Sequence, residues 1–123
     1  MSKTILIADD EEANLKSIQT ALRISGYKVV IAKDGNEAIQ KIEEHKPDLL
    51  ILDMLMPNLT GNEVCSNLRQ RQDELSRTPV IILTALDPML SEPKAVEAGA
   101  QKLLSKPVRP QDLLDTISEL LGK

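Results

Sequence analysis

The sequence predicts an α/β domain in which five helices cover a doubly wound parallel sheet of five strands. Short aliphatic runs alternate with longer stretches of helical period along the chain, which is the pattern of βαβ units. The runs are apolar at nearly every position, as expected for strands that are covered on both faces of the sheet. Five repeats of strand and helix account for residues 1–123, so we expect a single domain.

The expected strands are short, and aromatic residues are nearly absent from the chain. There is no Phe or Trp, and Tyr27 is the one aromatic residue. The strand bounds that the aliphatic runs predict are Thr4–Ala8, Lys28–Ala32, Asp48–Leu52, Val80–Leu83 and Gln101–Ser105. The core should therefore be built from Ile, Leu, Val, Ala and Met side chains.

Four of the five helices are predicted as ordinary amphipathic helices. The first begins near Glu12 and ends where Gly26 can adopt the left-handed conformation, the second begins at about Gly35, and the third begins near Asn62. The apolar residues that should face the sheet are Leu15, Ile18, Ala21, Leu22, Ala38, Ile39, Ile42, Val64, Cys65, Leu68, Leu113, Leu114, Ile117, Leu120 and Leu121.

The fourth helix is predicted to be short. Pro93 would cost about 3 kcal/mol in a helix interior, so a start shortly before it is favoured. We expect Ser91 as the N-cap, a helix from about Glu92 to Ala98, and Gly99 as its C-terminal stop.

Charge and composition argue against several classes of protein. Nineteen acidic against fifteen basic residues give a net charge of −4, which argues against direct binding of nucleic acid. No apolar stretch approaches the roughly 20 residues that span a bilayer, and the N-terminus lacks the pattern of a signal peptide. The single cysteine cannot form an internal disulfide. We expect a cytoplasmic protein that is not inserted into a membrane.

Polar residues follow four of the expected strands. They are Asp9-Asp10-Glu11-Glu12, Asp53, Thr84 and Ser105-Lys106-Pro107. In an open parallel sheet, ligands bind outside the carboxyl ends of the strands. Converging carboxylates repel one another unless a cation lies among them, and a hard oxygen site of this kind suits Mg²⁺. A carboxylate beside Mg²⁺, a hydroxyl and a lysine form a complete set for phosphoryl transfer to the carboxylate.

These residues resemble the motifs of receiver domains, the regulators of bacterial two-component signalling, over the full length of the chain. The matching residues are Asp9 and Asp10, the phosphoacceptor Asp53, Met56-Pro57, Gly61, Thr84-Ala85 and Lys106-Pro107. The resemblance implies a flavodoxin-like sheet with strand order 2-1-3-4-5.

The resemblance also implies the role of each site residue. Asp10 and Asp53 would bind Mg²⁺ directly, Asp9 would act through water, and the backbone carbonyl of Leu55 would be a further ligand. Thr84 and Lys106 would bind the phosphoryl oxygens. The peptide bond between Lys106 and Pro107 is expected to be cis.

The function that this resemblance implies is that of a phosphorylatable switch. Asp53 would take a phosphoryl group from a histidine kinase or phosphotransfer protein, and phosphorylation would change the binding of a downstream protein target. A homodimer through the face of the fourth helix, fifth strand and fifth helix is a further expectation. The domain would catalyse only its own phosphorylation and slow dephosphorylation, so it would not be an enzyme acting on other molecules.

Three other functions are weighed against this one. A phosphatase with an aspartate nucleophile usually needs a second Asp two positions later, where this chain has Leu55. A nucleotide-binding domain is disfavoured because no Gly-rich loop follows the first strand. A constitutive interaction module that kept the fold without the switching remains the main alternative.

Three leucines depart from the usual receiver pattern. Leu103 lies three positions before the lysine, where receivers usually carry an aromatic ring that moves inward on activation. We therefore expect the coupling between the site and the surface to be carried differently. Leu55 and Leu86 lie two residues after Asp53 and Thr84, where polar side chains could orient water. We expect slow loss of the phosphoryl group.

Several other residues are interpreted as structural. His45 lies in a polar helix exit and is expected on the surface. Cys65 shares a helix face with Leu68 and should be a buried hydrophobic residue. Met54, Met56 and Met89 are expected to be packing residues, with no role in metal binding.

Overall fold

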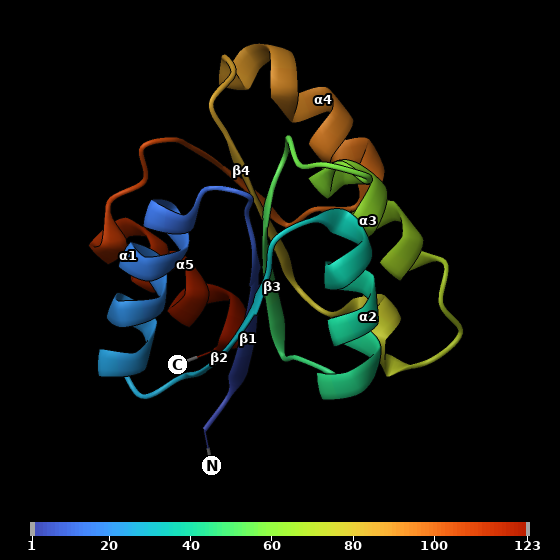
Figure 1. Ribbon diagram of the computed structural model, residues 1–123. Coiled ribbons are helices and arrows are strands. Elements are labelled where there is room, and N and C mark those ends of the chain that lie inside the picture. The colour runs from blue at the N-terminus through green and yellow to red at the C-terminus, as the bar shows by residue number, and fades with distance from the viewer. Residues whose placement is uncertain (1, 123) are drawn as a thin grey trace.

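The computed structural model describes residues 2–122 and has the predicted architecture (Figure 1). Its five parallel strands are ordered β2-β1-β3-β4-β5, which confirms both the fold class and the strand order. Their bounds are β1 Thr4–Ala8, β2 Lys28–Ala32, β3 Leu49–Asp53, β4 Val80–Thr84 and β5 Lys102–Ser105. Each bound lies within one residue of the prediction.

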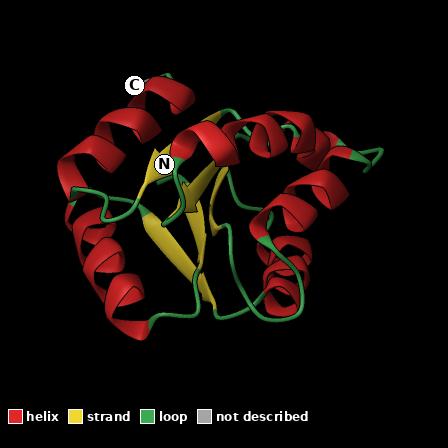
Figure 2. Cartoon of the chain, turned by 90° about the horizontal axis from the view of Figure 1, so that it is seen from above, coloured by secondary structure: helices red, strands yellow, loops and turns green. Residues whose placement is uncertain are grey.

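Helices cover both faces of the sheet, as seen from above in Figure 2. Their bounds are α1 Glu12–Ile24, α2 Gly35–His45, α3 Gly61–Arg69, α4 Pro88–Ala98 and α5 Pro110–Leu121, and a short 3₁₀ helix spans Glu74–Arg77. Helices α1 and α5 lie on one face, and α2, α3 and α4 lie on the other. The three central strands are thereby shielded from water on both sides.

The core consists of two aliphatic clusters separated by the sheet. Alternate residues of β1 divide between them, so that Leu6 and Ala8 pack toward α2 and α3, while Ile5 and Ile7 pack toward α1 and α5. All four are fully buried. Burial of each Leu or Ile side chain stabilises the fold by roughly 1.5–3 kcal/mol relative to an exposed position. The predicted aliphatic core is confirmed.

Helix α4 begins earlier than predicted. It starts at Pro88, and Asp87 caps it by accepting a hydrogen bond from Met89 N at 2.9 Å. The prediction of a start at Glu92 with Ser91 as the cap was therefore wrong. Proline is favourable at the first helical position, and the helix continues through Pro93 with one backbone hydrogen bond fewer. Ser91 lies inside this helix and is buried.

The remaining structural predictions can be compared with the burial of each side chain. His45 is exposed and Cys65 is buried, as expected. Met54 is buried and Met56 is half-buried against the core, but the prediction that Met89 packs was wrong. The Met89 side chain is 83% exposed, because the early start of α4 places it on the solvent side of the first turn.

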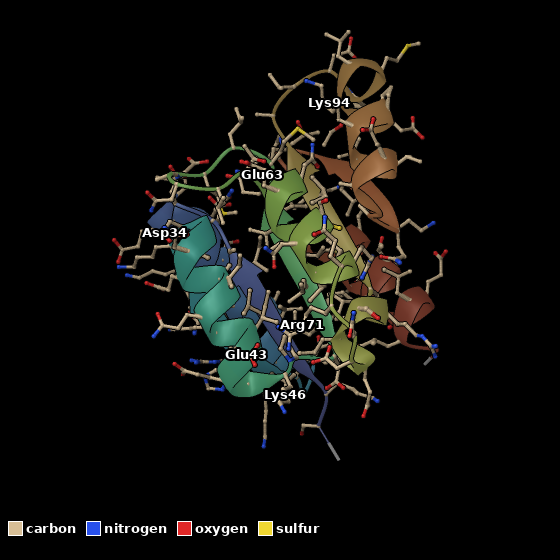
Figure 3. All side chains as sticks on the ribbon, turned by 90° about the vertical axis from the view of Figure 1, so that its right-hand side faces the viewer. Asp34, Glu43, Lys46, Glu63, Arg71 and Lys94 are labelled. Atoms are coloured by element: carbon tan, nitrogen blue, oxygen red, sulfur yellow. The ribbon has the colours of Figure 1, made fainter. Side chains whose placement is uncertain are left out.

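Two arginines connect α3 to its neighbours in different ways. Arg71, just after α3, forms a salt bridge with Glu43 of α2 at 2.6 Å on the protein surface (Figure 3). Arg69, the last residue of α3, is half-buried and donates hydrogen bonds instead to uncharged oxygens. The acceptors are Gly99 O, Ser76 O, Thr78 O and Gln101 Oε1. Arg69 thus links α3 to the segments around β4 and to the end of α4.

None of the helices within residues 2–122 combines the length and the apolar character that crossing a membrane requires.

Candidate functional site

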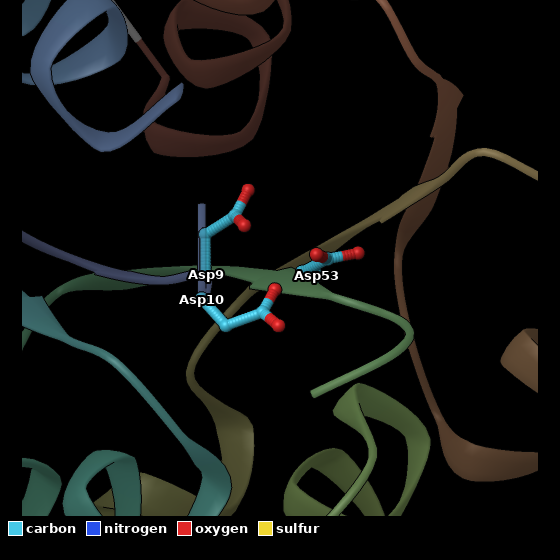
Figure 4. Close-up of side chains that lie close together, drawn as sticks. All are labelled: Asp9, Asp10 and Asp53. Carbon is cyan, nitrogen blue, oxygen red and sulfur yellow. The ribbon is translucent and has the colours of Figure 1, made fainter. Parts of the chain in front are cut away.

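Three carboxylates meet at the carboxyl edge of the sheet (Figure 4). Asp9 and Asp10 follow β1, and Asp53 is the last residue of β3, the strand beside β1. One oxygen from each carboxylate lies within 4.8 Å of the others. Asp9 and Asp53 are buried, while Asp10 is exposed to solvent. The fold therefore brings together the acidic residues that the sequence placed at separate strand ends.

The donor set fits a small hard cation. All three side chains offer oxygen ligands, and Mg²⁺ prefers one or two protein carboxylates together with waters. The exposure of Asp10 leaves room for such waters. Three close carboxylates repel one another, and the single positive charge of Lys106 does not balance all three, which is a second reason to expect a cation here.

Asp9 is held in place by hydrogen bonds from the start of α1. Its Oδ1 accepts from Glu11 N at 2.9 Å, and its Oδ2 accepts from Asn14 Nδ2 at 3.1 Å. The role of Asn14 was not predicted from the sequence. A polar side chain in the first turn of α1, after the acidic pair, was the available signal.

Lys106 supplies a positive charge to this site. Its Nζ lies 2.9 Å from Asp53 Oδ2, 3.2 Å from Asp9 Oδ2 and 3.3 Å from Glu11 Oε1. The backbone N–H of Lys106 donates to Thr84 O at 2.7 Å, which fixes the end of β5 beside β4. The peptide bond between Lys106 and Pro107 is cis, as predicted.

The pKa values of Asp53 and Lys106 are both raised, for different reasons. Burial raises the pKa of Asp53 to about 6, and the charge of Asp9 adds to this rise, against the lowering effect of the hydrogen bond from Lys106. Burial alone would lower the pKa of the Lys106 ammonium, but the hydrogen bonds and charges of Asp53 and Asp9 outweigh it. The net pKa shift of Lys106 is therefore upward, and its ammonium group stays charged at neutral pH.

Thr84, the last residue of β4, is almost completely buried, with 1% of its surface exposed. Its Oγ1 accepts a hydrogen bond from Leu86 N at 3.0 Å and lies 3.2 Å from Ser91 Oγ in α4. The contact with Ser91 was missed because Ser91 was expected to cap the helix. The hydroxyl group is thus attached to both the β4–α4 loop and α4.

The loop after Asp53 is held tightly against the strand end. Leu55 N lies 3.4 Å from Asp53 Oδ1, and Gly61 N donates to Met54 O at 3.0 Å. A Cβ atom on Gly61 would lie 2.5 Å from Asp53 O, which explains the glycine at the start of α3. The Leu55 side chain is 55% exposed at the rim of the site.

Comparison with known proteins agrees with this geometry. The family model for the response regulator receiver domain matches residues 5–118. The chain is 40% identical to the alkaline phosphatase synthesis transcriptional regulatory protein PhoP of Bacillus subtilis and to the response regulator MprA of Mycobacterium tuberculosis. Each match covers 100% of this chain but only 50% and 52% of those proteins, so the chain spans about half their length.

Solved structures of response regulators and receiver domains are also similar to this chain. A response regulator from Chloroflexus aurantiacus matches with a TM-score of 0.94 and 34% identity, and each chain is covered completely. The receiver domain of sensor histidine kinase PA1611 from Pseudomonas aeruginosa, solved with a magnesium ion in its active site cleft, matches with a TM-score of 0.90 and 27% identity over 100% of both chains. With its strand order and its acidic cluster, the chain belongs to the family of response regulator receiver domains.

Proposed function

We propose that this receiver domain is a phosphorylatable switch in which Asp53 accepts the phosphoryl group. The observation that carries the proposal is the position of Lys106 Nζ, 2.9 Å from Asp53 Oδ2 and 3.2 Å from Asp9 Oδ2. A cation placed between a nucleophilic carboxylate and a second acid can bind a phosphoryl oxygen as negative charge develops there. The proposed donor is a histidine kinase or phosphotransfer protein.

The transfer would form one bond and break one. An oxygen of Asp53 attacks phosphorus, the bond from phosphorus to the histidine nitrogen of the donor breaks, and the histidine keeps that electron pair. Lys106 and Thr84 then donate hydrogen bonds to phosphoryl oxygens. Thr84 must turn its hydroxyl group toward Asp53 to do so, since its Oγ1 is engaged with Leu86 N and Ser91.

Mg²⁺ is the cofactor that the acidic cluster suits, and receiver domains bind it at this site. Asp10 and Asp53 would bind it directly, Asp9 through water, and the Leu55 carbonyl would be a further ligand. When bound, Mg²⁺ would neutralise negative charge on the phosphoryl oxygens.

The output of the switch would be the binding of a downstream protein target. Receiver domains are signalling modules, so we assign this chain no reaction beyond its own phosphorylation and slow dephosphorylation. Helix α4 exposes the apolar side chains of Met89 and Val96, 83% and 63% exposed, which supports a protein contact or a homodimer through α4, β5 and α5.

We propose a cytoplasmic location, which is typical of the family, and no direct contact with nucleic acid.

The alternative is a constitutive interaction module. Leu103 favours it, because this half-buried side chain packs against the core and lacks the ring that usually moves on activation. Partner affinity or dimerisation that is the same before and after phosphorylation would identify such a module.

The direct test is the intact mass of the chain after incubation with Mg²⁺ and acetyl phosphate. A single phosphoryl adduct should form on the parent chain and should be missing from Asp53→Asn and from a sample with the metal chelated. A Glu63→Gln variant, which changes an exposed acid at the start of α3, is the matched control and should form the adduct. An adduct on Asp53→Asn would overturn the assignment of the acceptor.

The lifetime of the phosphoryl group should be set partly by Leu55. Because leucine cannot hydrogen-bond to the hydrolytic water and an amide can, Leu55→Asn should shorten the lifetime about 2- to 10-fold. Decay of the adduct can be followed by mass spectrometry after removal of acetyl phosphate. Met89→Asn, an exposed position on α4, is the control. An equal lifetime for Leu55→Asn and the parent would contradict the shielding role of Leu55.

A further inference from the structure

The hydroxyl group of Thr84 is joined to α4 by a buried hydrogen bond. Thr84 Oγ1 lies 3.2 Å from Ser91 Oγ, and the two residues are 1% and 4% exposed. Ser91 lies in the first turn of α4, which begins at Pro88. The bond therefore connects the end of β4 at the phosphorylation site directly to the start of a helix that lies on the protein surface.

The number of protons on the two hydroxyl groups determines how the bond must respond to phosphorylation. A hydroxyl group donates one hydrogen bond and accepts up to two. Once Thr84 donates its proton to a phosphoryl oxygen, it can pair with Ser91 only by accepting the Ser91 proton. If Thr84 moved alone, the buried Ser91 hydroxyl would lose this partner, which is unfavourable. Thr84 and Ser91 should therefore move together.

We propose that Ser91 positions the Thr84 hydroxyl group and transmits the phosphorylation state of Asp53 to the first turn of α4. The inference rests on the proposed function, because it requires Thr84 to bind the phosphoryl group. It assigns to Ser91 a coupling role that Leu103, with no hydroxyl group and no ring, cannot fill through hydrogen bonding.

The construction of α4 allows its first turn to move separately. Pro93 has no N–H to donate to the carbonyl group of Met89, so one hydrogen bond between the first turn and the rest of the helix is missing. The C-terminal end of α4 is held in place, because Arg69 Nε donates a hydrogen bond to Gly99 O at 3.0 Å. Gly99 ends the helix in the left-handed conformation. A displacement at Ser91 would thus be taken up near Pro93 while the C-terminal end stays in place.

The first turn also forms part of an apolar surface. Leu90 is 76% exposed and, together with Leu55 and Leu86, lines a groove of about 530 Å³ between α3 and α4. Ser91 lines the same groove. A shift of the first turn would change the shape of this groove, so the Thr84–Ser91 bond links the phosphorylation site to a surface that a protein partner can contact.

The test compares amide chemical shifts of the full chain before and after phosphorylation by acetyl phosphate and Mg²⁺. In the parent chain the amides of Met89 and Leu90 should shift on phosphorylation. In Ser91→Ala, Asp53 should still form the adduct. The population of chains in which the first turn of α4 is displaced should fall about 2- to 10-fold, which is the factor that one hydrogen bond contributes to an equilibrium. The chemical-shift changes of Met89 and Leu90 on phosphorylation should therefore be smaller than in the parent chain.

Two further variants separate coupling from general damage to the groove. Ser91→Thr keeps the hydroxyl group and should restore the response. Ser66→Ala removes a serine that lines the same groove from α3, and it should respond like the parent. A phosphorylated Ser91→Ala chain with the full shift differences would overturn the role of Ser91 alone. A parent chain that forms no adduct would overturn the proposed function and this inference together.

Discussion

Replacing Lys106 by Met should lower the rate of phosphorylation about 100- to 1,000-fold, the loss expected when one charge-stabilising group is removed from a transition state. Without metal, the free energy of unfolding should also fall by about 3 kcal/mol, because breaking a buried ion pair leaves the remaining charges uncompensated. Asp9 is fully buried, and the side chains of Asp53 and Lys106 are 8% and 11% exposed. Urea unfolding and the rate of adduct formation measure the two effects separately.

Addition of Mg²⁺ should recover part of the lost stability in the Lys106 variant, because a cation would again lie among the carboxylates. The matched control is Lys102→Met. Lys102 also comes from β5, but its ion pair with Glu119 lies at the surface, with the two side chains 40% and 64% exposed. Lys102→Met should change both the rate of adduct formation and the free energy of unfolding only slightly. Equal stability of Lys106→Met and the parent would show that Lys106 does not hold the carboxylates together.

Replacing Arg69 by Met should lower the free energy of unfolding by about 3 kcal/mol, because hydrogen bonds from a charged donor contribute roughly 1.5–3 kcal/mol each and are not additive. Its guanidinium group donates to four oxygens in two segments, residues 76–78 and 99–101, at distances of 2.7–3.1 Å. One acceptor belongs to Thr78, which is buried and would lose its partner without easy access to water. Urea unfolding gives the total effect.

Hydrogen exchange at Val80 gives a local readout of the same change. Gln101 Oε1 accepts from both Arg69 Nη2 at 2.8 Å and Val80 N at 2.7 Å, so loss of Arg69 should loosen this acceptor and speed exchange of the Val80 amide. Arg71→Met is the control, since Arg71 pairs with exposed acids on the surface. It should be far less destabilising. A similar loss of stability in both variants would contradict the distinct role of Arg69.

The sequence by itself determined the fold and indicated which charged residues meet at one edge of the sheet. Aliphatic runs of strand length, separated by amphipathic stretches, leave few arrangements other than a covered parallel sheet. In such a sheet all strands end at one edge, so Asp9, Asp53 and Lys106 could be expected to meet without knowledge of any distance. Residue type and strand position carried that prediction, because both are local properties of the chain.

The tertiary structure decided how these residues are supported and how α4 begins. Asn14 binds Asp9, Arg69 connects α3 to residues 76–78 and 99–101, and Ser91 pairs with Thr84. Each contact joins a side chain to a partner whose position depends on packing, and no periodic pattern encodes it.

The start of α4 also depends on the tertiary structure. Local helix preference alone predicted a start after Pro88, near Pro93, because a proline in the helix interior removes a backbone hydrogen bond. Burial of Ser91 and Ala95 against the sheet accompanies the longer helix, since contacts made across the fold can outweigh one missing backbone bond.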